Sequence, residues 1–348
     1  MKKYSFLLIV FLFFIFTGVW LFNLFAPSVS KQSGMVFYLK PGTSKSALIA
    51  DLSKRGVIRF PFLFSVYAHI KAKTYLKTGE YYFPPRSSAI SVWRQVTNGI
   101  GFFQRPFTIV PGWTFKQLRD ALLQAEGLEH QLASFNDKQA IRRLGYPKRH
   151  PEGIFFPDTY YYTRGLSDFT ILQRAIHDMQ KRLADAWQQR TTGLPYQDAY
   201  QALIVASLIE KETHLDRERP IIAGVIVNRL KKNMLLQIDP TVIYGMGERY
   251  QGVLNKNDLL QDTPYNTYIH KGLPPTPIAI PSMASIDAAL HPAQHRYYYF
   301  VAWGREGHQF SETLSAHQAA SAVAIKRRHG YFNEVLVRTM ISRLIKFQ

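Results

Sequence analysis

The sequence predicts an α+β protein with an N-terminal transmembrane helix, a small α/β subdomain and a larger mixed α+β domain. Three observations support this. Ser5 to Phe25 contains no charged residue. A strand, a Pro-Gly turn and an amphipathic helix follow each other twice, from Val36 and again from Phe107. Ala202 to Ile209 is apolar almost all the way round, as in a helix buried on most sides.

These patterns divide the 348 residues into six segments. We expect a cytoplasmic N-terminus and anchor (1–26), a tether (27–34), the subdomain (35–104), a second strand–helix unit (105–150), the larger domain (151–330) and a basic amphipathic C-terminal helix (331–348).

The apolar run is long enough to cross the hydrocarbon core of a membrane, which takes about 20 residues. Lys2 and Lys3 precede it, so we expect a single-pass protein whose N-terminus is cytoplasmic and whose remainder is exported. A cleaved signal peptide is the alternative. Asn23 to Pro27 is a poor small-residue cleavage site, which favours a retained anchor.

The formal net charge is +19, and the chain has no cysteine. The positive surplus indicates an anionic partner such as phospholipid headgroups or an acidic polymer. Export argues against nucleic acid, and the lack of cysteine excludes disulfides and thiolate chemistry. His291 and His295 are four residues apart but lack an acidic third ligand, so we expect no metal and no cofactor.

The first repeated unit begins with the strand at Val36, and helices are expected around Leu48 and from Pro61. An extended Gly79–Phe83 and a helix around Ile90 follow. This strand–helix–helix–strand order resembles the LysM glycan-binding module. A purely structural α+β unit without glycan binding is an equally good interpretation.

Glu210 follows the apolar helix directly, one turn beyond Ala206 and Ser207. Small residues on its own face would leave room for a ligand. Apolar surroundings favour a protonated carboxyl, which can act as a general acid. The alternative is a helix that simply surfaces at Glu210. Glu212 lies about 200° further round the helix and cannot share that face.

Two later segments are candidates for the wall of a binding site. The pattern from Gln237 to Tyr244 predicts a turn followed by a short helix, with Asp239 as the N-cap of that helix. The loop from Tyr265 to Pro275 combines tyrosines with amides, which suits the flat faces and hydroxyls of sugar rings. A DNA-binding helix-turn-helix is disfavoured here because of the anchor.

Three motifs together resemble the endolytic murein transglycosylase (MltG, YceG-like) family. They are Ala206–Thr213, Gln237–Gly245, and Tyr265–Tyr268 with Gly272–Pro275. Shorter matches follow at Ala289–Pro292, Tyr299–Val301 and His308–Phe310, so the likeness covers roughly 35–321. Pro281-Ser282 departs from it, because the family usually has Pro-Gly at this turn.

The resemblance implies an inner-membrane lytic transglycosylase, a lyase with its catalytic domain in the periplasm. Such enzymes cleave MurNAc–GlcNAc bonds within nascent peptidoglycan strands, end their elongation and leave 1,6-anhydro-MurNAc ends. It assigns the catalytic glutamate to Glu210. Gln237, Tyr244, Asn266 and Tyr268 are expected to orient sugars, with Glu212 in support. Peptidoglycan synthases are expected partners.

Two other functions fit the same residues. A lysozyme-like hydrolase would need a second carboxylate, from Glu152 or Asp158. A non-catalytic glycan-binding scaffold of the wall-synthesis machinery would need none. A lytic transglycosylase needs one carboxyl only, because the C6 hydroxyl of MurNAc is its internal nucleophile.

Overall fold

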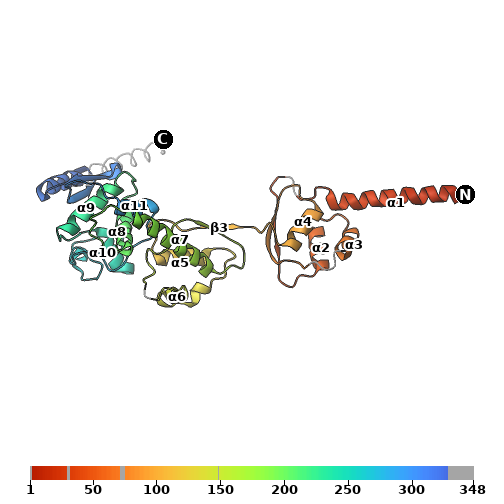
Figure 1. Ribbon diagram of the computed structural model, residues 1–348, viewed down its shortest axis with the longest axis horizontal. Coiled ribbons are helices and arrows are strands. Elements are labelled where there is room, and N and C mark those ends of the chain that lie inside the picture. Colours follow the sequence, from red (N-terminus) through yellow and green to blue (C-terminus); the bar gives the residue numbers. More distant parts are fainter. Residues whose placement is uncertain (1, 30–31, 71–74, 148, 328–348) are drawn as a thin grey trace, which may run out of the picture. The chain divides into compact units, whose positions relative to one another are not determined.

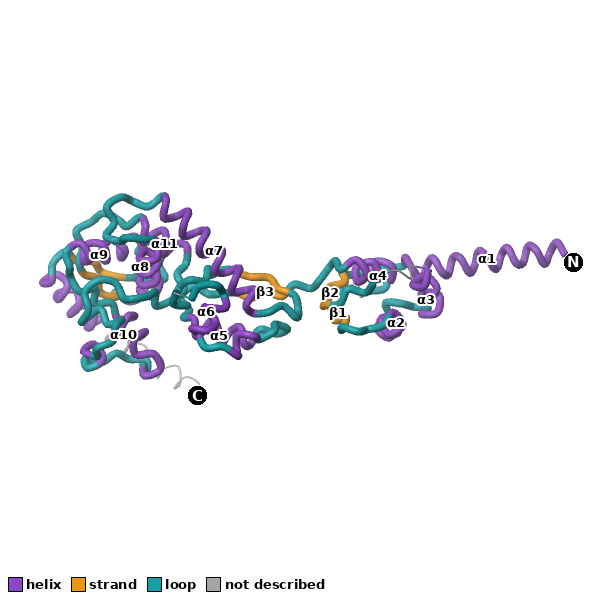
Figure 2. The backbone as a smooth tube through the Cα atoms, turned by 60° about the horizontal axis from the view of Figure 1, so that its bottom comes forward, coloured by secondary structure: helices purple, strands orange, loops and turns teal. Residues whose placement is uncertain are grey.

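The chain folds into two compact units, described by a computed structural model for residues 2–29, 32–70, 75–147 and 149–327 (Figure 1). Unit 1 comprises Met1–Phe107, Ala125–Glu129 and Tyr161–Ser167. Unit 2 comprises Thr108–Gln124, His130–Tyr160 and Asp168–Gln348. The mixture of helices and short strands confirms the α+β class (Figure 2). The predicted C-terminal helix at 331–348 lies outside the described residues.

Unit 1 contains the strand–helix–helix–strand order that the sequence predicts. Its elements are α1 (Lys2–Phe25), β1 (Met35–Leu39), α2 (Lys45–Lys54), α3 (Pro61–Ile70), β2 (Gly79–Phe83) and α4 (Ala89–Asn98). β1 and β2 pair antiparallel, with Phe37 opposite Tyr81. Ser44 and Ser88 cap α2 and α4, each accepting a backbone N–H of the first helical turn. The likeness of this unit to LysM stays a prediction.

The core of unit 1 is aromatic. Phe64 of α3 packs edge-to-face on Trp93 of α4, and Tyr81 stacks near Phe83 on β2. All four side chains are buried. Aromatic pairs of this geometry stabilise a core beyond the area they bury, so both helices are held against the two-stranded sheet.

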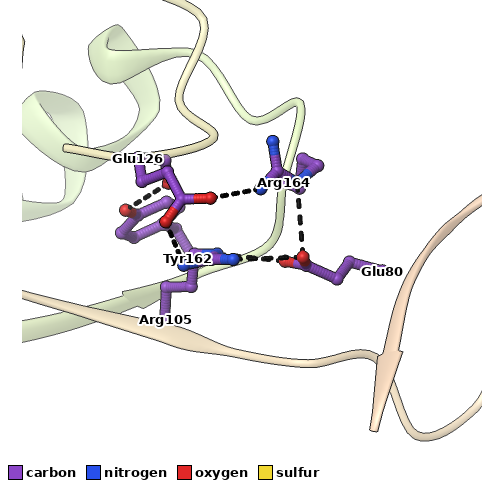
Figure 3. A network of polar contacts seen from close by, with 5 residues as sticks. All are labelled: Glu80, Arg105, Glu126, Tyr162 and Arg164. Carbon is purple, nitrogen blue, oxygen red and sulfur yellow. Dashed lines mark hydrogen bonds and ion pairs between the residues drawn. The ribbon is translucent and has the colours of Figure 1, made fainter. Parts of the chain in front are cut away.

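Glu80 of β2 is a buried carboxylate at the centre of an ion-pair network that links β2 to later segments of unit 1 (Figure 3). Arg105 binds both of its oxygens at 3.0 Å and also reaches Glu126 at 3.2 Å. Arg164 donates to Glu126 at 2.7 Å and to Glu80 at 3.4 Å. Burial opposes the charge on Glu80, but the bonds from Arg105 outweigh it and hold the pKa of Glu80 below its usual range. The network explains why these segments belong to this unit.

α1 is the one helix among the described residues that is long and apolar enough to cross a membrane, over Tyr4–Phe25. This is compatible with the predicted single-pass anchor. The chain after α1 is packed on unit 1, at the start of the expected tether: Ser28 and Val29 donate backbone bonds to Ser87, and Val29 is buried.

Unit 2 is mostly helical. Its elements, with the two strands at the boundary, are β3 (Arg105–Thr108), α5 (Phe115–Gln124), α6 (Asp137–Arg143), β4 (Thr159–Tyr162), α7 (Asp168–Gln188), α8 (Ala199–Glu212), α9 (Arg219–Lys231), α10 (Asp239–Met246), α11 (Met283–Leu290), β5 (Tyr299–Ala302) and β6 (His308–Ser311). β3 pairs with β4, and β5 with β6. Single 3-10 turns lie at Gln131–Ser134, Gly247–Arg249, Asp258–Leu260 and Gly304–Glu306.

α8 is the central helix of unit 2. It contacts α7, α9, α10 and α11, and every residue from Ala202 to Ile209 is buried. This confirms the buried helix that the apolar run predicts. The helix continues one half-turn past Glu210, however, and ends at Glu212 with Thr213 as its C-cap. Both glutamates therefore lie on the same last turn of a rigid element.

Candidate active site

Glu210 is held by the start of α11. One oxygen, Oε2, accepts three hydrogen bonds: from the Ser282 backbone N at 2.9 Å, the Ser282 hydroxyl at 2.6 Å and the Ser285 hydroxyl at 2.7 Å. The other oxygen lies 3.8 Å from Arg219. Three donors and a cation suit a carboxylate that is fixed in place.

A later segment of the chain packs on the face of α8 beside Glu210. The hydroxyl of Ser207, on that face, accepts a bond of 3.0 Å from the backbone N of Ile278. The segment running from Ile278 to Ser282 therefore occupies part of the space that the small residues leave. The room that the small residues were expected to leave for a ligand is at least partly taken by a segment some 70 residues later in the chain.

Ser282 has a role that its departure from the family pattern did not suggest. It is the N-cap of α11, accepting from the N of Ser285, while its hydroxyl donates to Glu210. A glycine at this position could offer only the backbone donor. Ser282 thus adds a hydrogen bond to the carboxylate.

Glu212 has a different environment. It is partly buried, and its carboxyl makes no hydrogen bond or ion pair with the described residues. Burial, with the negative charge of Asp239 nearby, raises the pKa of Glu212 to about 8. A carboxyl with such a pKa is largely protonated at neutral pH, the form that a general acid needs.

Asp239 and Tyr268 lie beside Glu212. The Tyr268 hydroxyl donates a bond of 2.5 Å to Asp239 Oδ1. Asp239 is the first residue of α10, and it makes no capping bond there. The interpretation of Asp239 as a helix cap is therefore wrong, because its carboxylate accepts the hydrogen bond from Tyr268 instead. The phenol bridges the loop after α10 to the start of α10.

Gln237 completes this group. Its Oε1 accepts a bond of 3.2 Å from Arg229, whose guanidinium also binds the backbone oxygens of Leu235 and Leu236. The backbone of Gln237 has a φ of 54°, which is uncommon for a residue with a side chain. Its exposed side chain is thus presented by a strained turn. We call Glu212, Gln237, Asp239 and Tyr268 the Glu212 cluster.

Tyr244 makes no hydrogen bond to the Glu212 cluster among the described residues and pairs with Glu152 instead. Its hydroxyl donates to Glu152 Oε2 at 3.0 Å, while the N of Phe115 donates to Oε1 at 2.8 Å. Burial outweighs these bonds and raises the pKa of Glu152 to about 7. Glu152 is only 3% exposed. The hydroxyl of Tyr244, which was expected to orient sugars, therefore forms a hydrogen bond with a buried carboxyl group inside the fold.

Asn266 is fully buried, with 0% of its surface exposed. Its amide donates to the backbone oxygens of Leu259 and Gln261, and its Oδ1 accepts from the N of Tyr268. Every polar atom of the side chain is thereby used to fold the loop. The expectation that Asn266 contacts sugars is wrong for this reason, and its contribution is to position Tyr268.

A group that sequence reasoning missed lies just beyond Glu212. Buried Glu218 accepts from Thr213 at 3.1 Å and from the backbone N and ring Nδ1 of His308, each at 2.8 Å. Burial opposes its charge, but the bonds from His308 hold the pKa of Glu218 below its usual range. The group ties β6 to the turn after α8. The His308–Phe310 motif was the available signal.

The comparisons with known proteins bear on the whole chain. The YceG-like family model matches residues 37–323. An endolytic murein transglycosylase of Bacillus subtilis is 30% identical over 304 residues, covering 83% of this chain and 84% of that protein. One from Streptococcus pneumoniae is 28% identical, over 76% of this chain and 54% of its own length.

A solved structure agrees with these sequence matches. The crystal structure of a YceG-like protein from Listeria monocytogenes is similar with a TM-score of 0.55 and 28% identity, covering 83% of this chain and 99% of that one. The family match covers most of unit 1 and also α8, the helix that carries both glutamates. The chain belongs to the YceG-like family.

Proposed function

We propose that this protein is an endolytic peptidoglycan lytic transglycosylase that cleaves MurNAc–GlcNAc bonds and leaves 1,6-anhydro-MurNAc ends. Relatives named endolytic murein transglycosylase support the activity. The observation that carries it within the fold is the Glu212 cluster: a carboxyl with a pKa of about 8, beside a tyrosine and an exposed amide.

Glu212 is the proton donor in this proposal. It protonates the glycosidic oxygen that leaves, and the C6 hydroxyl of the same MurNAc attacks C1. The carboxylate that results then accepts the proton of that hydroxyl, so the group ends protonated. Internal attack gains from proximity and requires no water. Gln237 and Tyr268 lie where they can orient the sugars.

The family resemblance assigns the acid role to Glu210, but the contacts of the two glutamates favour Glu212 in that role. Glu210 Oε2 is occupied by three donors and a later segment packs beside it. Glu212 has no such partner among the described residues, so its proton is available. Glu210 then acts as a positioning residue that joins α8 to α11.

A hydrolase is the second candidate, since Asp239 supplies a second carboxylate close enough to raise the pKa of Glu212. Glu152 cannot serve, because both of its oxygens are engaged in a buried site. Asp158 is exposed and accepts from the N of Thr159. The bond from Tyr268 to Asp239 favours a supporting role for Asp239 over activation of water.

The mass of the products separates these functions. Full-length protein is incubated with purified glycan strands and the ends are analysed by mass spectrometry. A lytic transglycosylase gives ends lighter by one water than reducing ends, at internal positions of the strand. Reducing ends would indicate the hydrolase. Binding without cleavage, unaltered by Glu212→Gln, would indicate a scaffold.

We further propose that α1 holds the enzyme in the inner membrane with unit 2 in the periplasm, beside the synthases that extrude new strands. The +19 net charge would add attraction to anionic headgroups. Replacing α1 by a cleavable signal peptide tests this. We expect unchanged activity on isolated wall and longer strands in cells; unaltered strand length would refute the role of the anchor.

A further inference from the structure

α3 carries an exposed apolar stripe. Phe62, Val66 and Ile70 are four residues apart, so they lie on one face of the helix. Their exposed fractions are 78%, 45% and 68%. Large apolar side chains that are exposed together in this way mark an interaction surface rather than a core.

The opposite face of α3 is the one that stabilises unit 1. Phe64 and Ala68 are buried there, and Phe64 packs on Trp93. The helix therefore has two apolar faces. The fold uses one, and the stripe is left uncovered by the described residues.

The start of α3 is bonded to the last turns of α1. Trp20 Nε1 donates to the Leu63 oxygen at 3.2 Å. Asn23 exchanges two bonds with the backbone of Phe60, at 3.2 Å and 3.0 Å. Because Asn23 is buried, these bonds set the height of α3 relative to the anchor.

Arg59 reinforces the junction. Its guanidinium lies 4.8 Å from the centre of the Phe22 ring and donates to the Pro27 oxygen at 3.0 Å. An arginine next to the end of an apolar helix is well suited to the headgroup level of a membrane, where its charge stays hydrated.

The length of α1 fixes where α3 lies if α1 crosses a membrane. Tyr4–Phe25 has 22 residues, about 33 Å at 1.5 Å per residue, which matches a hydrocarbon core of about 30 Å. Trp20 is five residues before the end of α1, roughly 8 Å along the helix. The start of α3, bonded at that level, therefore lies within about 8 Å of the boundary between hydrocarbon and headgroups.

The two views of unit 1 agree with this placement. In Figure 1 and in Figure 2, α3 lies at the end of unit 1 from which α1 departs, and β1 and β2 lie at the far end. α3 therefore lies at the anchor end of unit 1.

We propose that α3 is a membrane-interface helix, whose Phe62, Val66 and Ile70 insert into the same bilayer that α1 crosses. The inference rests on the proposed membrane anchor. With two attachments, unit 1 is held flat on the bilayer at a fixed height instead of swivelling on a single helix.

The chain has no cysteine, so single Cys variants can carry a nitroxide spin label. We would compare Val66→Cys with Val36→Cys, because the two valines are 45% and 41% exposed and lie on α3 and β1. The full-length protein is reconstituted in liposomes of phosphatidylethanolamine and phosphatidylglycerol. Collisions of the label with oxygen and with a water-soluble nickel chelate report its surroundings.

We expect the label at 66 to collide preferentially with oxygen, as in lipid, and the label at 36 to collide preferentially with the chelate. Equal chelate access at both positions would overturn the proposal. A label at Phe13→Cys tests the anchor separately: an aqueous signal there would refute the anchor and the inference together. Oxygen preference at 13 with chelate preference at 66 would refute α3 alone.

A second variant tests whether the exposed apolar side chains of α3 are what hold the helix in the bilayer. Phe62→Glu with Ile70→Glu, in the Val66→Cys background, changes exposed side chains that take no part in the core. We expect the oxygen preference at 66 to be lost. Its persistence would show that these side chains do not hold the helix in the bilayer and would overturn the proposal.

Discussion

The hydroxyl of Ser282 donates a hydrogen bond of 2.6 Å to Oε2 of Glu210. This contact joins the cap of α11 to the last turn of α8, and it is one of three that occupy the same oxygen. It is the reason for treating Glu210 as a fixed, positioning carboxylate. The proposed mechanism therefore takes its proton donor from Glu212, two residues later.

Ser282→Ala is expected to destabilise unit 2 by roughly 3 kcal/mol, because it removes both a helix cap and a hydrogen bond to a carboxylate. Asn136→Ala is the matched control: Asn136 caps α6 in the same unit and should cost about 1 kcal/mol. Chemical denaturation measures both. An equal cost for the two variants would mean that the bond to Glu210 adds nothing.

The pH dependence of cleavage should report the pKa of Glu212. A general acid must be protonated, so kcat/KM is expected to fall as pH rises through about 8. The fall should be about tenfold per pH unit above that point. We call this fall of kcat/KM above about pH 8 the alkaline limb of the pH profile. The Glu210→Gln variant should show the same alkaline limb. Its disappearance in that variant would return the acid role to Glu210.

Asp239→Asn removes the negative charge that helps to raise the pKa of Glu212. The alkaline limb of kcat/KM should therefore move to lower pH, by roughly one pH unit. Asparagine can still accept the Tyr268 hydroxyl, so the loop should keep its place. Asp262→Asn, an exposed carboxylate of the same unit, should leave the limb where it is. An unmoved limb in Asp239→Asn would show that the two carboxyls do not interact.

Glu152 should make unit 2 less stable as pH rises. Its folded pKa of about 7 lies above the ordinary 4.5, so the folded state binds the proton more tightly, and stability is lost as pH rises from about 5 through 7. The difference corresponds to roughly 3 kcal/mol. Thermal unfolding of Glu152→Gln should lack this loss, whereas Asp158→Asn should keep it. A wild-type slope in Glu152→Gln would contradict the burial argument.

Local patterns were enough to predict several elements of this fold. The uncharged Ser5–Phe25 run became α1, the Pro-Gly units became β1 with α2 and β3 with α5, and the apolar Ala202–Ile209 run became the central helix α8. In each case the signal lies within about ten to twenty neighbouring residues, so periodicity and turn chemistry carry it.

The candidate site was only partly predictable. Glu212 lies close enough to Tyr268 to raise the pKa of that tyrosine, and both interact with Asp239 at the start of α10. The helical angle also separated Glu210 from Glu212 correctly. Which of the two faces is covered depends on Ile278 and Ser282, some 70 residues away, and no local pattern contains that information.

Asn266 and Tyr244 show the same limit. Both residue types suit sugars, yet Asn266 folds its own loop and Tyr244 satisfies the buried Glu152. A sequence shows which side chains can form hydrogen bonds. Only the packed chain shows which of those bonds are already made.

The rates of glycan cleavage by Glu212→Gln and by Glu210→Gln show which glutamate donates the proton. Removing a general acid costs about 10²–10⁴-fold, so Glu212→Gln should lose at least about 100-fold in kcat while its unfolding midpoint is retained or raised, since a buried acid is replaced by a neutral amide. Glu210→Gln should lose stability and a smaller part of the rate. The reverse order, with Glu212→Gln near the wild-type rate and Glu210→Gln inactive but stably folded, would contradict the account.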